Sequence, residues 1–221
     1  MTLKSRLVLR FVFMPVVWGA FLFLPAGSLR FWQGWVYLMI CFVPSISAFV
    51  YFYKHDPKLI ERRMQLKEKV PEQKLIMKLV YIIYFVAFLL PGLDHRFGWS
   101  HLPLWLTILS QALVLGGWVM MYWVMKVNSF ASRTIQVEPG QRVISTGPYR
   151  VVRHPMYLGA SLMFLFTPLA LGSSFALPAF ALLIPFIVLR LLNEEKVLRQ
   201  ELSGYADYCL HTRFRLVPFL W

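Results

Sequence analysis

The stretch Thr146-Gly-Pro-Tyr-Arg-Val-Val-Arg-His-Pro-Met-Tyr-Leu-Gly-Ala160 places a polar loop directly before an apolar helix. It brings Arg150, Arg153, His154 and two tyrosines to the mouth of a hydrophobic segment. Pro155 suits the first turn of a helix, where its missing N–H would have no intrahelical partner in any case. Charged groups at the edge of an apolar medium are unfavourable unless they bind something, so the stretch predicts a ligand site at a helix start.

The composition of the 221-residue chain is typical of a protein that lies in a membrane. Hydrophobic residues make up 58% of it, and they occur in long runs rather than in the stripes of soluble amphipathic helices. We therefore predict an integral membrane protein with an all-α fold, a multi-pass transmembrane helical bundle. Allowing roughly 17–25 residues for each crossing, the runs predict six spans, at about residues 7–26, 32–53, 75–92, 102–126, 156–172 and 175–192.

The basic residues indicate how the chain is oriented in the membrane. With these six spans, all of the 23 Lys and Arg residues except Arg30 and Arg96 fall on the side that also holds both termini. Because cytoplasmic loops are enriched in Lys and Arg, we expect both termini to be cytoplasmic. The same bias, together with attraction to anionic membrane lipids, accounts for the net charge of +13, so no nucleic-acid partner is expected.

The segment His55–Gln73 is a basic connector between the second and third predicted spans. An interfacial helix is expected here that ends before Pro71, since the residue before a proline disfavours helical backbone angles. Its basic side chains suit contact with membrane lipids. A role in gripping an anionic substrate is the alternative interpretation.

A second charged motif, Arg190-Leu-Leu-Asn-Glu-Glu195, closes the last span. Arg190 and Glu194 are four residues apart and share a helical face, whereas Glu195 is turned by about 100° from Glu194. If the last two spans form a hairpin across residues 172–175, this motif lies beside the Arg-His-Pro loop. Alone it also fits an ordinary salt-bridge cluster, but two charged clusters at adjacent helix ends favour a functional site.

Together the two motifs offer groups for chemically distinct parts of a ligand. Arg and His suit a carboxylate or phosphate, paired carboxylates suit a ribose diol or an ammonium, and tyrosine faces suit a cation. This set suits S-adenosylmethionine and, in part, a nicotinamide dinucleotide. No G-x-G-x-x-G follows a strand, so a Rossmann site is not expected for either. Cys41 and Cys209 lie in unrelated settings, so neither a disulfide nor a metal site is expected.

The same motifs resemble the isoprenylcysteine carboxyl methyltransferase family and the related membrane phospholipid methyltransferases. The resemblance covers roughly residues 120–221 and rests on Gly147-Pro-Tyr149, Arg153-His-Pro-Met-Tyr-Leu-Gly159, Arg190-x-x-x-Glu-Glu195, Gly204-Tyr205 and Arg213-Phe-Arg-Leu-Val-Pro218. It implies a membrane enzyme that holds S-adenosylmethionine in a cytoplasmic-face cofactor pocket near the last helical hairpin. A lipophilic methyl acceptor would enter from the bilayer.

The resemblance also implies roles for individual residues. The implied cofactor-binding residues are Gln141, Tyr149, Arg153, His154, Pro155, Tyr157, Leu158, Gly159 and Glu195. The implied catalytic residues are Arg190, which would position the acceptor, and Glu194, the candidate base for an amine acceptor. Family members often carry His where this chain has Gln141, although Gln can still donate a hydrogen bond. The expected reaction is O-methylation of a carboxylate, which needs no base.

Three other functions are compatible with the sequence. The acceptor could be a phospholipid amine. NADPH-dependent membrane sterol reductases resemble the chain around Arg-His-Pro and in the tail, but they typically carry an acidic residue at the position of Ala160, whereas methyltransferases carry the Glu194-Glu195 pair seen here. A non-catalytic membrane protein is the third.

The chain is expected to have two parts. Residues 1–101 form the N-terminal transmembrane helices, the first three spans with the basic connector, and residues 102–221 form the methyltransferase core of spans four to six, cytoplasmic loop and tail. Gly116-Gly117, within the fourth span, is a hint of close helix packing.

Overall fold

The computed structural model describes residues 3–64 and 71–221, with side chains from residue 13 onward and, beyond the gap, from residue 75. The prediction of an all-α fold is confirmed. The β-structure of these residues is limited to one isolated β-bridge, between Val152 and Phe214. The helices are α1 (Leu3–Ala26), α2 (Trp32–His55), α3 (Pro57–Met64), α4 (Pro71–Phe97), α5 (Leu104–Val127), the 3-10 helix η1 (Gly147–Arg150), α6 (Pro155–Ala170), α7 (Leu177–Ala181), α8 (Leu183–Glu201) and α9 (Tyr205–His211).

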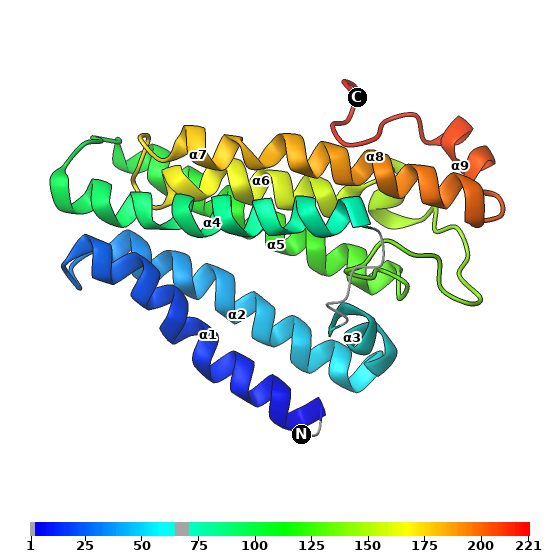
Figure 1. Cartoon of the computed structure of the whole chain (residues 1–221), viewed down its shortest axis with the longest axis horizontal. Helices are drawn as coiled ribbons and strands as arrows, with labels where there is room; N and C mark the ends of the chain where they lie inside the picture. The colour runs from blue at the N-terminus through cyan, green and yellow to red at the C-terminus, as the bar shows by residue number, and fades with distance from the viewer. Residues whose placement is uncertain (1–2, 65–70) are drawn as a thin grey trace.

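The helices form a bundle and a hairpin (Figure 1). Helices α4, α5, α6 and α8 run side by side, and α1 and α2 lie against one side of them, with the start of α1 diverging from the bundle. The loop from α5 to η1, helix α9 and helix α3 gather at one end, which we call the pocket end. The α4–α5 and α6–α7 connections lie at the opposite end.

The lengths of the helices fit an integral membrane protein. Among the described residues, four helical stretches are long and apolar enough to cross a membrane: Trp32–His55, Leu75–Phe97 within α4, Leu104–Val127, and Leu177–Glu201, which is α7 followed by α8. Two further helices are largely apolar where their side chains are described: α1, which has 24 residues, and α6, which has 16. The 16 residues of α6 extend about 24 Å, less than the roughly 30 Å of the hydrocarbon core. Helices therefore occupy all six predicted places, and α6 is shorter than a full crossing.

Two spans differ most from the sequence prediction, and both contain prolines. Helix α4 continues through Pro91 and past residue 92 to Phe97, and the next residue, Gly98, has the positive φ of 66° that suits a glycine after a helix. The predicted span 175–192 is interrupted at Leu182 and then continues to Glu201. Pro185 explains the interruption, because it lacks the N–H that would bond to the carbonyl four residues earlier.

The expected interfacial helix is α3, which ends at Met64, whereas Pro71 begins α4 and residues 65–70 lie outside the described residues. The Asp56 carboxylate accepts a hydrogen bond from the Leu59 N–H (3.0 Å) at its start. Leu59 and Ile60 are buried against the bundle. The helix is therefore packed onto the protein rather than only onto lipid.

Helices α5 and α6 meet backbone to backbone at two glycines. A β-carbon on Gly117 would lie 2.7 Å from the carbonyl oxygen of Gly159 and 2.6 Å from Met163 Cγ. A β-carbon on Gly159 would lie 2.9 Å from the carbonyl oxygen of Gly117. Small residues allow such close approach of membrane helices. Since α6 starts at Pro155, this crossing sets the position of the Arg-His-Pro loop.

The N-terminal hairpin is joined to the bundle by aromatic packing. The Trp18 ring lies 5.4 Å from the Tyr84 ring, 5.8 Å from Phe85 and 4.6 Å from Phe88, measured between centroids. Gly92 allows the close approach of α1, because a β-carbon there would lie 2.5 Å from the Leu22 carbonyl oxygen. The result is one continuous apolar core at membrane depth.

A buried carboxylate ties the loops together at the end opposite the pocket. Asp94, 2% exposed, accepts hydrogen bonds from the Ser100 backbone N–H (2.7 Å), the Ser100 hydroxyl (2.6 Å) and the Ser173 hydroxyl. The Ser100 oxygen in turn accepts from the N–H groups of Ser174 (3.1 Å) and Phe175 (3.0 Å). One side chain on α4 thus links the α4–α5 loop to the α6–α7 turn.

We expect Asp94→Asn to lower the melting temperature of the purified protein by several degrees. The amide offers one oxygen where the carboxylate offers two, and hydrogen bonds to charged groups are worth about 1.5–3 kcal/mol each. Thermal unfolding in detergent measures the change. Asp207→Asn, at an exposed position on α9, is the matched control. Equal melting temperatures for the two variants would contradict the assigned role.

Candidate functional site

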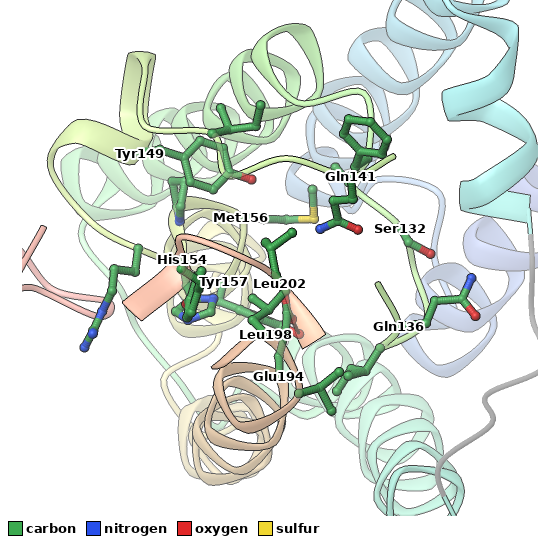
Figure 2. A pocket seen from close by; sticks show the side chains of 18 of the residues that line it. Ser132, Gln136, Gln141, Tyr149, His154, Met156, Tyr157, Glu194, Leu198 and Leu202 are labelled. Carbon is green, nitrogen blue, oxygen red and sulfur yellow. Dashed lines mark hydrogen bonds between the residues drawn. The ribbon is translucent and has the colours of Figure 1, made fainter. Parts of the chain in front are cut away.

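A pocket of about 240 Å³ opens at the pocket end of the bundle. Its walls are the loop after α5, η1, the start of α6, the end of α8 and α9, with Arg63 of α3 on one side. Figure 2 shows His154, Tyr157 and Glu194 grouped on one side, with Ser132 and Gln136 of the loop on the other. The two charged motifs of the sequence, which lie about 40 residues apart, therefore face a common space.

The first cluster in this region is centred on Glu195. Its carboxylate lies 3.0 Å from Arg153 Nε, 3.3 Å from His154 Nε2 and 3.1 Å from Arg215 Nε. Glu195, Arg153 and His154 are 3%, 7% and 5% exposed. Removing one partner from a buried ion cluster leaves the other charges uncompensated, so this cluster holds the Arg-His pair firmly in place.

The tail after α9 completes this cluster. The N–H of Arg153 donates to the Phe214 carbonyl (2.9 Å), and the N–H of His154 donates to the Arg215 carbonyl (3.0 Å). These bonds place the Arg215 side chain against the second oxygen of Glu195. The Arg-His-Pro loop is consequently fixed from two sides, by α8 through Glu195 and by the tail through its backbone.

The second cluster joins α6 to α8 at the pocket wall. The Tyr157 hydroxyl donates to Glu194 Oε2 at 2.6 Å. Arg190, one helical turn earlier, donates through Nη2 to the Arg133 carbonyl at 2.6 Å. Glu194 and Arg190 both line the pocket, so an acidic and a basic group face a ligand there.

Tyr149 is held by neighbours from three segments. Its hydroxyl accepts from Asn128 Nδ2 (2.8 Å), and its carbonyl accepts from the hydroxyls of Tyr208 (2.7 Å) and Thr212 (3.3 Å). Burial raises the pKa of the Tyr149 hydroxyl to about 12, although the bond from Asn128 opposes the shift. Tyr149 is therefore a fixed, neutral wall of the pocket at physiological pH.

Most residues singled out in the sequence line this pocket. They are Gln141, Tyr149, Arg153, His154, Pro155, Tyr157, Arg190 and Glu194. The other three lie elsewhere. Glu195 stands behind Arg153 and His154, Leu158 is half-buried outside the pocket lining, and Gly159 packs against α5.

Sequence reasoning gave no role to several side chains that lie at this site. They are Arg63, Arg133, Met156, Tyr205 and Arg215. Tyr205 and Arg215 belong to quoted motifs, and Arg63 belongs to the basic connector, but nothing in their local sequence shows where they point. The Tyr205 hydroxyl is buried in the pocket wall and has no hydrogen-bond partner among the described residues.

The chain is similar in sequence or in fold to several known proteins. Residues 105–203 match the model of a family described as phospholipid methyltransferase. The mouse (Mus musculus) Delta(14)-sterol reductase TM7SF2 is 33% identical over 92 residues, which are 40% of this chain and 22% of the reductase. The chain thus spans well under two thirds of that relative's length.

A solved structure shares the fold of the entire chain. It is the eukaryotic intramembrane Ras methyltransferase ICMT, isoprenylcysteine carboxyl methyltransferase, with a TM-score of 0.51 at 18% identity over 100% of this chain and 88% of that one. At this identity the likeness concerns the fold. Together with the match over residues 105–203, it confirms the resemblance inferred from the sequence motifs.

Proposed function

We propose that the protein is an integral membrane methyltransferase that transfers a methyl group from S-adenosylmethionine to a lipophilic acceptor. The observation that carries the proposal is the pocket at the end of the bundle, whose walls lie largely within the family-matched residues 105–203. It combines arginines, a carboxylate and tyrosines at the point where apolar helices end. Few ligands other than a charged cofactor and an amphiphilic partner suit such a lining.

The residues of the pocket fit this cofactor chemically. The Tyr205 hydroxyl is buried without a partner and is available to a polar ligand atom. Burial raises the pKa of this hydroxyl, so it is a neutral donor at physiological pH. Arg153 and His154 suit the amino-acid carboxylate, and Glu194 suits the ammonium. The bound cofactor supplies an electrophilic methyl group on a sulfonium.

A second cavity supports a lipophilic acceptor. It encloses about 330 Å³ between α1, α2, α4, α5 and α6, and its lining is mainly apolar. Trp118 and Met163 of this cavity lie one helical turn from Met121 and Ala160 of the pocket, on the same faces of α5 and α6. An acyl or isoprenoid chain in this cavity would have its head group at the pocket.

The chain's own residues have a modest chemical task. Methyl transfer from a sulfonium is an in-line displacement, for which alignment and exclusion of water supply much of the rate. Arg190 would align a carboxylate acceptor, which needs no base. For a phospholipid amine, Glu194 would accept the proton. We favour carboxylate O-methylation, because the arginines around Glu194 suit an anionic acceptor better than a cationic one.

We expect Arg190→Ala to lower kcat about tenfold or more while the affinity for S-adenosylhomocysteine stays unchanged, because misalignment of reacting groups affects turnover more than cofactor binding. Methyl transfer from radiolabelled cofactor to N-acetyl-S-farnesylcysteine measures the carboxylate reaction. Phosphatidylethanolamine vesicles measure the amine reaction. Lys196→Ala, exposed on the same helix, is the control. If Arg190→Ala lowers the affinity for S-adenosylhomocysteine instead, Arg190 binds the cofactor rather than the acceptor.

The sterol reductase relative supports a second candidate function, an NADPH-dependent membrane reductase. Calorimetric titration of the detergent-purified protein with S-adenosylhomocysteine and with NADPH separates the two. Micromolar binding of the former alone supports the methyltransferase. Binding of NADPH alone would replace the proposal with the reductase.

Topology and domain organisation belong to the same proposal. The concentration of Lys and Arg at the pocket end supports cytoplasmic termini and cofactor entry from the cytosol. The division into residues 1–101 and 102–221 is supported by the family match, which begins at residue 105. Accessibility of cysteines introduced at the two ends of the bundle tests the orientation.

A further inference from the structure

The pocket carries more positive charge than the proposed cofactor can use. Five arginines line it, and Glu194 is the one carboxylate among the described lining residues. The arginines are Arg63, Arg133, Arg142, Arg153 and Arg190. S-adenosylmethionine has a sulfonium, an ammonium and a carboxylate, and is therefore itself a net cation. This cofactor therefore does not account for five lining arginines.

Two of the five arginines are accounted for by nearby carboxylates. Arg153 is paired with Glu195. Arg190 lies one helical turn from Glu194 on the same helical face, and it is the residue assigned above to align the acceptor. The remaining three, Arg63, Arg133 and Arg142, form no ion pair with any carboxylate in residues 13–64 and 75–221.

Arg63 is the most unusual of these three because it comes from outside the family-matched region. It lies on α3, yet it lines the pocket of residues 105–203. Its Nη1 has two long contacts, to the Ala131 carbonyl (3.4 Å) and to Met156 Sδ (3.5 Å). Burial, and next the charge of Arg133, lower the pKa of the Arg63 guanidinium to about 10, so it is still charged at neutral pH.

The neighbouring Arg62 shows what a structural arginine does on the same helix. It donates to the Ser129 carbonyl at 2.7 Å and lies over the Phe130 ring at 4.9 Å. These contacts tie α3 to the loop after α5. Arg63 does not add comparable contacts, so its charge is not explained by attachment of α3.

We propose that Arg63, together with Arg133, forms an anion-binding subsite for a carboxylate or phosphate in the head group of the methyl acceptor. The inference rests on the proposed function and specifies it, since the N-terminal half then contributes to acceptor choice. A guanidinium offers paired donors that match the oxygens of either anion. Met156, in contact with Arg63, also begins the α6 face that leads to the apolar cavity. An amphiphile could thus place its anionic group on Arg63 and its apolar chain in the apolar cavity.

The test compares Arg63→Gln with Arg62→Gln in the full chain, purified in a neutral detergent. Decanoate and decyl phosphate are the anionic probes, decanamide is the uncharged probe, and calorimetry measures their affinities. Arg63→Gln should weaken binding of at least one anionic probe about tenfold, as expected for loss of a charge-assisted contact. Arg62→Gln should bind as the wild type does, and decanamide should not distinguish the variants. The better anionic probe identifies carboxylate or phosphate as the natural group.

Arg63→Lys separates loss of charge from misfolding, because it keeps the cation and should recover most of the affinity. The proposal is overturned if neither anion binds the wild type, or if Arg62→Gln and Arg63→Gln lose equal affinity for the anions. It is also overturned if Arg63→Gln lowers the affinity for S-adenosylhomocysteine and leaves the affinity for the anions unchanged. Binding of S-adenosylhomocysteine to the wild type is measured separately. If S-adenosylhomocysteine does not bind, the proposed methyltransferase function is wrong. The titrations with the amphiphiles test only the role of Arg63.

Discussion

Replacing Glu195 with alanine is expected to abolish S-adenosylhomocysteine binding and to lower the free energy of unfolding by about 3–5 kcal/mol. Glu195 does not line the pocket, so the effect acts through the residues that it holds. Without the carboxylate, Arg153 and Arg215 repel one another in a buried site, and His154 loses its partner. Both lining residues then leave their places in the pocket wall. Calorimetry and thermal unfolding measure the two effects.

Glu194→Gln is the matched control for Glu195→Ala. Glu194 lies one position earlier on α8, lines the pocket and accepts one bond from Tyr157, which glutamine can still accept. We expect a smaller loss of affinity and a nearly unchanged melting temperature. Unchanged affinity in folded Glu195→Ala protein would show that the Arg-His pair does not need its anchor to bind the cofactor.

Gly117→Ala is expected to lower the melting temperature more than any other single-methyl addition in α5. The new methyl group would lie 2.7 Å from the Gly159 carbonyl oxygen, which is backbone and cannot rotate away. The two helices must separate, and overpacking of this kind costs about 1–3 kcal/mol. Because α6 carries the start of the pocket, cofactor affinity should fall together with stability.

Gly116→Ala is a sharp control for this effect, because a β-carbon there meets nothing within 4 Å. It should be neutral or slightly stabilising, since alanine favours the helix over glycine by about 0.5–1 kcal/mol. Thermal unfolding of the two variants in the same detergent gives the comparison. Similar melting temperatures would mean that α5 and α6 do not meet as closely as the structure has them.

The helices were predictable where the apolar runs end at strong signals. The second span, predicted at residues 32–53, corresponds to Trp32–His55. The third was predicted to end at about residue 92, whereas in the structure the helix passes Pro91 and ends at Phe97, before Gly98. A proline within a packed bundle does not by itself end a helix, since neighbours satisfy the freed carbonyl. Whether a helix continues past a proline therefore depends on contacts with neighbouring helices, which the local sequence does not show.

The site was predictable to the extent that its motifs are local. The Arg-His-Pro loop and the Glu-Glu pair each occupy a few consecutive residues, and the hairpin of α6 and α8 brings them together. Arg63 and Arg215 come from the connector and the tail, about 90 residues before and 60 residues after the loop. Their positions follow from the packing of α3 and the backbone pairing of the tail. Neither has a sequence period or spacing that would reveal it.

The pairing of residues 152–154 with the tail also sets an order on biosynthesis. Arg153 and His154 donate to carbonyls that the ribosome produces about 60 residues later. At roughly 5–20 residues per second, the loop waits about 3–12 s for these partners. Helices α6 and α8 can enter the membrane in that time, but the carboxylate between them still lacks Arg215. A nascent chain that stalls before residue 214 is therefore an inserted protein without a finished pocket wall, and activity begins only once the tail has been made and docked.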